Sequence, residues 1–248
     1  MSWRSSREKP WWMLPRRRTC STSSGARFSM SQNVSLVVTC VGMERTLIKS
    51  TVSNGRLPHV YHFDSKAEVE DYARSVGIPA TFFLPGFYMA NIPGSMMRPD
   101  PSNDGAWTFS LPIPATASIP VFDPADTGKY VKAAILHRDR VLGKRILGAT
   151  AYLTAAEIVE GVKHVFPKAG ATATYKQSSE VEYLQGLIQG KGMPEHIAQE
   201  LLENMLLLDQ PGYYGGESLD DTHKLVADEL TTWEEFAKKS TRWGADLE

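Results

Sequence analysis

Two ionisable side chains, His62 and Lys66, lie four residues apart near the start of a predicted helix. Residues at this spacing share one face of a helix, so one ligand can contact both. Histidine can act as an acid near neutral pH, which makes His62 a candidate for proton transfer. Both residues could equally be ordinary polar side chains on a partly exposed helix, and that interpretation stays open.

The elements that would position this pair follow directly in the sequence. A helix is predicted over residues 64–76, with Gly77 as its stop. Its apolar positions recur at three- and four-residue spacing, and they are Val69, Tyr72, Ala73 and Val76. The short apolar run at 80–84 then ends at Pro85-Gly86, which favours a buried parallel strand. A helix, a glycine and a strand in this order are typical of α/β proteins.

Residues 85–91 come directly after the predicted strand. In open α/β sheets the ligand crevice lies at the carboxyl ends of the strands, so this segment is a second candidate site. A packing interpretation is open here too, because side chains such as Phe87, Tyr88 and Met89 fill cores more often than they contact cofactors. Asn91 is the residue that packing explains least.

The rest of the chain predicts further strands and a mostly helical C-terminal region. Strands are expected at 34–41, 107–111, 119–122 and 144–150, and helices at 123–137, 180–189 and 194–208. Thr154 and Glu157 have the spacing of a capping box, and Thr231 or Thr232 is expected to begin a last helix.

Three finer predictions concern single features of these elements. In the helix at 123–137, small residues should pack closely on a sheet and two larger residues should supply its apolar stripe: Gly128, Ala133 and Ala134 for packing, and Val131 and Ile135 for the stripe. Asp126 is assigned to helix capping rather than to chemistry. The run Tyr213-Tyr214-Gly215-Gly216 suggests an exposed loop that could recognise a partner.

Composition limits the class of protein. With 248 residues, 42% hydrophobic and 22% charged, the chain should form one main core. Two cysteines, Cys20 and Cys40, give neither a disulfide framework nor a zinc spacing, so we expect no metal and a reducing compartment. The longest apolar stretch, 34–43, is too short to span a membrane.

Charge is distributed unevenly along the chain. Among residues 1–31, seven are basic and one is acidic, which gives +6 and, with the total of −1, leaves −7 for the rest. This balance argues against direct nucleic-acid binding by the folded part. We interpret 1–31 as a disordered basic leader. A mitochondrial transit peptide fits less well, because Pro10 and Pro15 interrupt it. A cytoplasmic or nuclear location is therefore expected.

Several motifs together resemble one protein family. In order they are HVYHFDSK (59–66), EVE (68–70), IP (78–79), PGFYMAN (85–91), IP (119–120), DTG (126–128) and GKRI (143–146). This pattern is similar to the NmrA-like branch of the atypical short-chain dehydrogenases and covers roughly residues 47 to 180. The resemblance implies an α/β fold, a partial Rossmann-like parallel sheet with helices on its faces, occupying about 32–150, followed by a helical subdomain at about 151–248.

The resemblance also implies a cofactor and its contacts. Short-chain dehydrogenases place a catalytic tyrosine four residues before a lysine that binds ribose hydroxyls. Here Lys66 matches the lysine, but His62 stands in the tyrosine position and Tyr61 is five residues away. NmrA-like proteins are similar in this departure, which implies binding of NADP or NAD without robust turnover. Lys66 would contact the ribose or nicotinamide, and the nicotinamide site would be lined by Phe87, Tyr88, Met89, Ala90 and Asn91.

One part of the family pattern is not found. Glycines before residue 60 are only Gly25, Gly42 and Gly55, so the glycine-rich turn that cradles a pyrophosphate is missing. We therefore expect a truncated Rossmann core.

Three functions remain open on the sequence alone. The first is an NAD(P)-binding regulator or redox sensor that docks a transcription factor or another regulatory protein. The second is an NAD(P)H-dependent oxidoreductase in which His62 is the acid. The third is a cofactor-free interaction scaffold or fragment.

Overall fold

The computed structural model describes residues 36–39 and 55–243, and for 36–39 only the backbone strand. The chain divides into two units, Met1–Val34 and Ser35–Glu248, and the first lies entirely outside the described residues. The predicted leader and both cysteines therefore lie outside the described residues as well.

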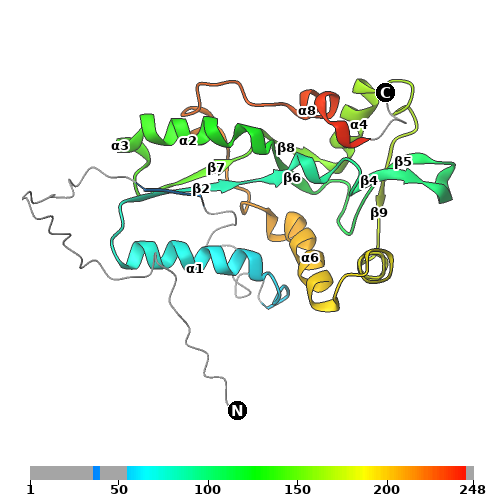
Figure 1. The fold of residues 1–248 in the computed structure, drawn as a ribbon, viewed down its shortest axis with the longest axis horizontal. Helices are drawn as coiled ribbons and strands as arrows, with labels where there is room; N and C mark the ends of the chain where they lie inside the picture. Colours follow the sequence, from blue (N-terminus) through cyan, green and yellow to red (C-terminus); the bar gives the residue numbers. More distant parts are fainter. Residues whose placement is uncertain (1–35, 40–54, 244–248) are drawn as a thin grey trace, which may run out of the picture. The chain divides into compact units, whose positions relative to one another are not determined.

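The central sheet has three parallel strands in the order β1-β2-β7, with bounds Leu36–Thr39, Ala80–Pro85 and Arg145–Gly148. Phe82 to Pro85 pair with Arg145 to Gly148 in register. Helix α1 (Tyr61–Ser75) covers one face of this sheet, while α2 (Thr127–Leu136) and α3 (Arg138–Val141) lie on the other face (Figure 1). A parallel sheet with helices on both faces confirms the predicted α/β class.

Two further three-stranded sheets extend the domain. One has the order β3-β6-β8, with bounds Phe87–Tyr88, Ser118–Phe122 and Ala151–Thr154, and the other has the order β4-β5-β9, with bounds Met97–Asp100, Ala106–Leu111 and Thr174–Gln177. The sequence did not predict β3, β4, β8 or β9, and the strand predicted at 144–150 corresponds to β7, which ends at Gly148. Because β8 and β9 pair with β6 and β5, the region beyond residue 150 contributes to both of these sheets.

The C-terminal helices are α4 (Ala155–Val165), α5 (Glu180–Gln185), α6 (Glu195–Leu207), α7 (Asp220–His223) and α8 (Trp233–Lys239). The capping box predicted at Thr154 and Glu157 is confirmed, and Thr232 forms another with Glu235. The remaining helical turns are Met89–Asn91, Pro101–Asn103, Pro124–Asp126, Gly186–Gly190, Leu208–Gly212 and Thr241–Trp243. No helix within residues 55–243 is long and apolar enough to cross a membrane.

Helix α1 buries a different face from the one its apolar spacing predicts. The predicted stripe ends in Val76, whose side chain is 48% exposed and lies beyond the helix. Of the predicted stripe Ala73 is buried, and the other buried positions of the helix are Phe63, Ala67 and Glu70. The prediction was wrong because a charged residue belongs to the buried face, and apolar periodicity cannot register it. Gly77 does follow the helix, with a φ of 69° that suits glycine.

The buried carboxylate of Glu70 is neutralised by two arginines. Arg74 and Arg145 each place a guanidinium nitrogen within hydrogen-bond distance of Glu70 Oε1, at 2.7 and 3.1 Å. Arg74 also donates to the Gly143 carbonyl and lies over the Phe82 ring. A buried charge is tolerated only when it is paired in this way. The network fixes the C-terminal half of α1 against β7.

Helix α2 also differs from its predicted packing. Ala133 and Ala134 face the sheet as expected, together with Tyr130. Ile135, however, is 62% exposed, and the space beside Gly128 is open, so neither residue packs on the sheet. The helix was predicted from residue 123, but a 3-10 turn at Pro124–Asp126 precedes it, and the helix begins at Thr127.

Replacing Glu70 by glutamine should lower the free energy of unfolding by about 2 kcal/mol, because two arginines lose their shared counter-charge. Chemical denaturation measures this loss. Glu68→Gln, at an exposed position of the same helix, is the control and should change stability by less than about 0.5 kcal/mol. Equal effects of the two variants would contradict the role of the buried network.

Candidate functional site

The first turns of α1 lie at the carboxyl end of β2. The Phe63 ring packs edge-on against the Tyr213 ring, with centroids 5.9 Å apart. The Tyr213 hydroxyl in turn donates to the Pro85 carbonyl at 3.1 Å. Lys66 is three residues after Phe63 on α1 and therefore belongs to the same end of the helix. These contacts bring the two sequence-predicted regions, around Lys66 and after Pro85, to one end of the central sheet.

Lys66 is partly buried. Within residues 55–243, no carboxylate lies within ion-pair distance of its ammonium group. A lysine ammonium has three donors and no acceptor, so it suits hydroxyl or carbonyl oxygens of a ligand. The position of Lys66 thus remains compatible with the role that its sequence suggests.

His62 is not a free side chain. Its Nδ1 lies 3.1 Å from Glu200 Oε1, and its backbone N–H donates to the same oxygen at 2.8 Å. The rest of its side chain is 77% exposed. The carboxylate therefore orients the imidazole and leaves its other nitrogen at the surface.

The five residues after Gly86 divide into buried and accessible ones. Phe87 and Met89 are 5% and 0% exposed and belong to the hydrophobic core. Their side chains are unavailable to a ligand, so any cofactor contact there would use the backbone. Tyr88 is partly exposed, its ring lies against Phe122, and burial raises the pKa of its phenol. The exposed Asn91 completes the accessible set.

The Ala90 carbonyl already has a partner, because it accepts a hydrogen bond from the Arg242 guanidinium near the end of the described chain. This contact ties the turn at Met89–Asn91 to the turn at Thr241–Trp243. The Ala90 carbonyl is therefore already engaged within the protein.

The glycine at the end of β2 is required by packing. A Cβ at Gly86 would collide with the Pro120 carbonyl and crowd the Gly148 carbonyl and Ala149. No side chain fits where the chain leaves one sheet for the next. The Pro85-Gly86 motif is thus explained structurally, whether or not a ligand binds beside it.

The run at 213–216 is exposed at Gly216, but its two tyrosines are not, although the sequence suggested an exposed loop. Tyr213 and Tyr214 are 9% and 1% exposed, and the Tyr214 hydroxyl donates to the Leu84 carbonyl at 2.7 Å. Burial raises the pKa of both phenols well above the usual value, so both remain neutral donors. The prediction was wrong because the two phenols bind strand carbonyls that are remote in sequence.

Asp126 also departs from its prediction. It makes no side-chain cap on α2. Instead its carboxylate is 2% exposed, accepts from the backbone and hydroxyl of Thr231, and pairs with Lys129. It anchors the segment before α8 to the start of α2, which is a structural role.

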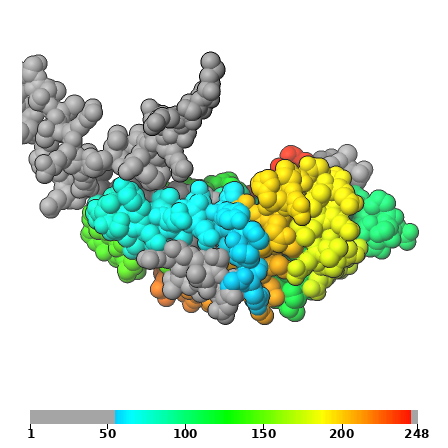
Figure 2. Space-filling model, turned by 90° about the horizontal axis from the view of Figure 1, so that it is seen from below, coloured from blue at the N-terminus to red at the C-terminus, as the bar shows by residue number. Residues whose placement is uncertain are grey.

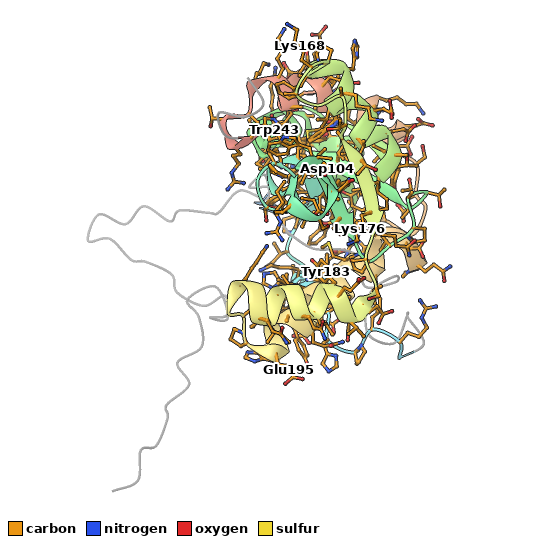
Figure 3. All side chains as sticks on the ribbon, turned by 90° about the vertical axis from the view of Figure 1, so that its right-hand side faces the viewer. Asp104, Lys168, Lys176, Tyr183, Glu195 and Trp243 are labelled. Atoms are coloured by element: carbon orange, nitrogen blue, oxygen red, sulfur yellow. The ribbon has the colours of Figure 1, made fainter. Side chains whose placement is uncertain are left out.

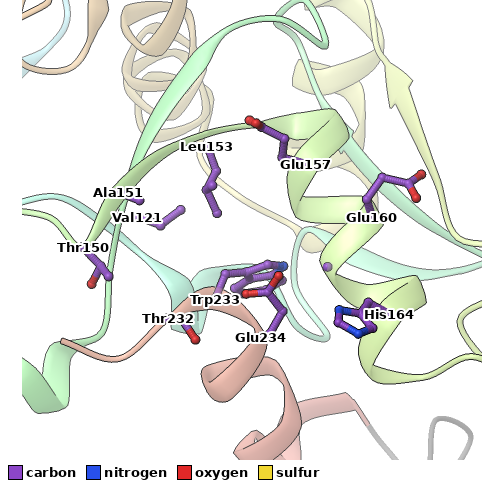
Figure 4. A pocket seen from close by; sticks show the side chains of 11 residues that line it. Val121, Thr150, Ala151, Leu153, Glu157, Glu160, His164, Thr232, Trp233 and Glu234 are labelled. Atoms are coloured by element: carbon purple, nitrogen blue, oxygen red, sulfur yellow. The ribbon is translucent and has the colours of Figure 1, made fainter. Parts of the chain in front are cut away.

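Cavities within the described residues include the following two. The larger, of about 570 Å³, lies between β8, α4 and α8 and is lined by Leu153, Glu157, Glu160, His164 and Trp233 among others (Figure 4). None of the sequence-predicted site residues lines it. The smaller, of about 420 Å³, is lined by Tyr152 and Tyr213 and therefore adjoins the carboxyl end of β2. No cluster of His, Cys, Asp or Glu in the described ranges is arranged to hold a metal ion.

The sequence matches a known protein family and one of its members. The model of the NmrA-like family matches residues 46–237. The chain belongs to the NmrA-like family. It is 33% identical over 187 residues to the nitrogen metabolite repression protein nmr of Neurospora crassa, a match that covers 68% of this chain and 35% of that protein. Strand β1 precedes the matched range.

Solved structures share the fold. NmrA, a negative transcriptional regulator, in complex with NADP has a TM-score of 0.62 at 20% identity, with 83% of this chain and 63% of that chain covered. An NADPH-dependent quinone oxidoreductase from Escherichia coli has a TM-score of 0.53 at 22% identity, with 71% and 58% covered. At this identity the likeness concerns the fold, and the predicted Rossmann-like class is confirmed. The chain spans about a third of the Neurospora protein and under two thirds of NmrA.

The residues present fit one half of a dinucleotide. Lys66 would supply donors for ribose hydroxyls, and Tyr88 and Asn91 are accessible groups at the strand end. A pyrophosphate needs a glycine-rich turn that leads into a helix N-terminus. Between β1 and α1 the described segment 55–60 contains one glycine, Gly55. The described residues therefore fit the nicotinamide riboside half of NAD(P).

Sequence reasoning did not connect four residues with this site. Tyr213 and Tyr214 cover the end of β2, and Glu200 and Glu203 of α6 contact the start of α1. The one available signal was the presence of two glutamates three residues apart in the apolar part of α6. That spacing alone does not indicate a partner.

Tyr214→Phe should lower the free energy of unfolding by about 1 kcal/mol, because the buried Leu84 carbonyl loses its phenol donor. Tyr61→Phe removes a hydroxyl from a side chain that is 55% exposed and should be nearly neutral. Denaturant titration of both variants tests this difference, and a neutral Tyr214→Phe would show that the phenol contact contributes nothing.

Proposed function

We propose that this chain acts as an NAD(P)-binding regulatory protein with little or no dehydrogenase turnover. The observation that carries the proposal is the placement of Lys66 on the first turns of α1. Those turns contact the carboxyl end of β2, because Phe63 packs against Tyr213 and the Tyr213 hydroxyl donates to the Pro85 carbonyl. Ligands bind at this end of open α/β sheets. NmrA, which shares the fold, has been crystallised with NADP and with NAD.

The low turnover follows from what stands beside Lys66. A tyrosine four residues before the lysine would supply the proton in a reductase, and His62 holds that position. Its Nδ1 is engaged by Glu200, as is its backbone N–H. A site that binds the cofactor without a positioned phenol suits sensing rather than reduction.

The regulatory role is supported by the relatives. The Neurospora protein is named for nitrogen metabolite repression, and NmrA is described as a negative transcriptional regulator. We propose that the partner of this chain is likewise a transcription factor or another regulatory protein, whose docking depends on which dinucleotide is bound. Direct DNA contact is not part of the proposal, since the chain beyond residue 31 carries a net charge of −7.

Titration with NADPH and with NADH, followed by protein fluorescence, tests binding. We expect saturable binding by the unmodified chain and an affinity loss of at least about tenfold in Lys66→Ala, because the ammonium donates to the bound ribose. Lys168→Ala is the matched control, at an exposed lysine far from α6 (Figure 3). Absence of saturable binding by the unmodified chain would refute the proposal.

A second candidate, a reductase with His62 as acid, is favoured by the Glu200 contact, because a carboxylate at Nδ1 orients an imidazole for proton transfer from its exposed nitrogen. Protonated His62 would then donate its exposed N–H proton to the carbonyl oxygen of a substrate, and a bound dinucleotide would be the source of the hydride for the carbonyl carbon. Cofactor oxidation across a panel of carbonyl compounds should then fall about 100-fold in His62→Ala. His196→Ala, at an exposed histidine of α6, is the control, and an unchanged rate in His62→Ala would exclude the role.

A further inference from the structure

Helix α6 presents two buried carboxylates to the beginning of α1. Glu203 accepts from the His59 backbone N–H at 2.5 Å and contacts His59 Nδ1 at 2.6 Å. Glu200 makes the same pair of contacts with His62, at 2.8 and 3.1 Å. The two glutamates are 2% and 9% exposed. We name these four residues, His59, His62, Glu200 and Glu203, the α1–α6 clamp, and Figure 2 shows the surfaces of the two helices side by side.

The clamp replaces a cap that α1 lacks in its own sequence. The N-cap residue is Val60, whose side chain cannot accept a hydrogen bond. The first N–H groups of a helix have no partner within the helix, and the positive end of its dipole favours a carboxylate. Glu200 meets both needs from another helix, because it accepts from the His62 N–H of the first turn, while Glu203 holds the His59 N–H one residue before the N-cap. The position of the first turns of α1 therefore depends on α6.

The other end of α1 is held independently. Glu70 pairs there with Arg74 and Arg145, and Arg74 donates to the Gly143 carbonyl. Loss of the clamp should thus loosen the first turns while the last turns stay in place. Lys66 lies between the two anchors, one turn after His62.

We propose that Glu200 and Glu203 are positioning residues for Lys66, so that the affinity for the dinucleotide is regulated through α6. This inference rests on the proposed function. A carboxylate at each position holds the first turns of α1 against the carboxyl end of β2, and from there the ammonium reaches the ligand. A partner that displaces α6 would weaken cofactor binding, and bound cofactor would disfavour that displacement to the same extent.

Hydrogen exchange of the ligand-free protein tests the mechanical step. Glu203→Gln removes the negative charge, so the contacts to the His59 N–H and imidazole lose their charged acceptor and weaken. We expect the amides of residues 61–66 to exchange about tenfold faster, while those of 70–75 are unchanged. Glu200→Gln is the milder variant if Glu203→Gln unfolds. Glu195→Gln, at the exposed start of the same helix, is the control (Figure 3).

A double-mutant cycle tests the coupling to the cofactor. Glu203→Gln should weaken NADPH binding about tenfold in the unmodified chain and have little further effect in Lys66→Ala, because its influence passes through that side chain. Equal weakening in both backgrounds would show a general structural role and overturn the inference. Uniformly faster exchange along α1, or unchanged affinity despite faster exchange, would overturn it as well.

The two proposals can fail separately. No saturable NADPH binding by the unmodified chain refutes the proposed function and, with it, the coupling. Binding that is lost in Lys66→Ala but is unaffected by Glu203→Gln and Glu200→Gln leaves the proposed function standing and refutes the coupling alone.

Discussion

The fixed position of helix α1 is the constraint on which the candidate site depends. Three buried carboxylates hold it, Glu200 and Glu203 at its start and Glu70 within its buried face. A buried charge is costly unless several donors satisfy it, and each of these glutamates has at least two contacts to donors or basic groups. Displacement of α1 would leave these buried carboxylates without partners, so the cost of burial favours one position of the helix. Lys66 owes its place at the end of the sheet to this arrangement.

The carboxyl end of β2 is the second part of the site, and two tyrosines cover it. Tyr213 and Tyr214 donate to the Pro85 and Leu84 carbonyls, and Gly86 leaves no room for a side chain between neighbouring strands. The chain there is rigid and mostly buried. Tyr88 and Asn91 are the groups of the following turn that remain accessible, so a ligand would meet a small and well-defined surface.

Much of the organisation could be predicted from local patterns. The presence and order of the helix, glycine and strand within 61–85 were predicted correctly, although the buried face of the helix was not. The capping box at Thr154 was also predicted correctly, because glycine and capping residues act within a few positions of one another. The strands β4 and β9 were not predicted. They are four residues each and carry charged or polar side chains at exposed positions, such as Arg98 and Lys176, so they show no run of apolar residues.

The sequence by itself determined the family and the identity of the candidate residues, since Lys66, His62 and the 85–91 motif are recognised by type and spacing. The tertiary structure decided what those residues can do. In the folded chain Phe87 and Met89 lie in the core, Glu200 contacts His62, and Tyr213 is buried with its hydroxyl on the Pro85 carbonyl. The partners of these contacts are more than 100 residues apart in the chain. No local pattern records such pairs, because packing of whole elements brings them together.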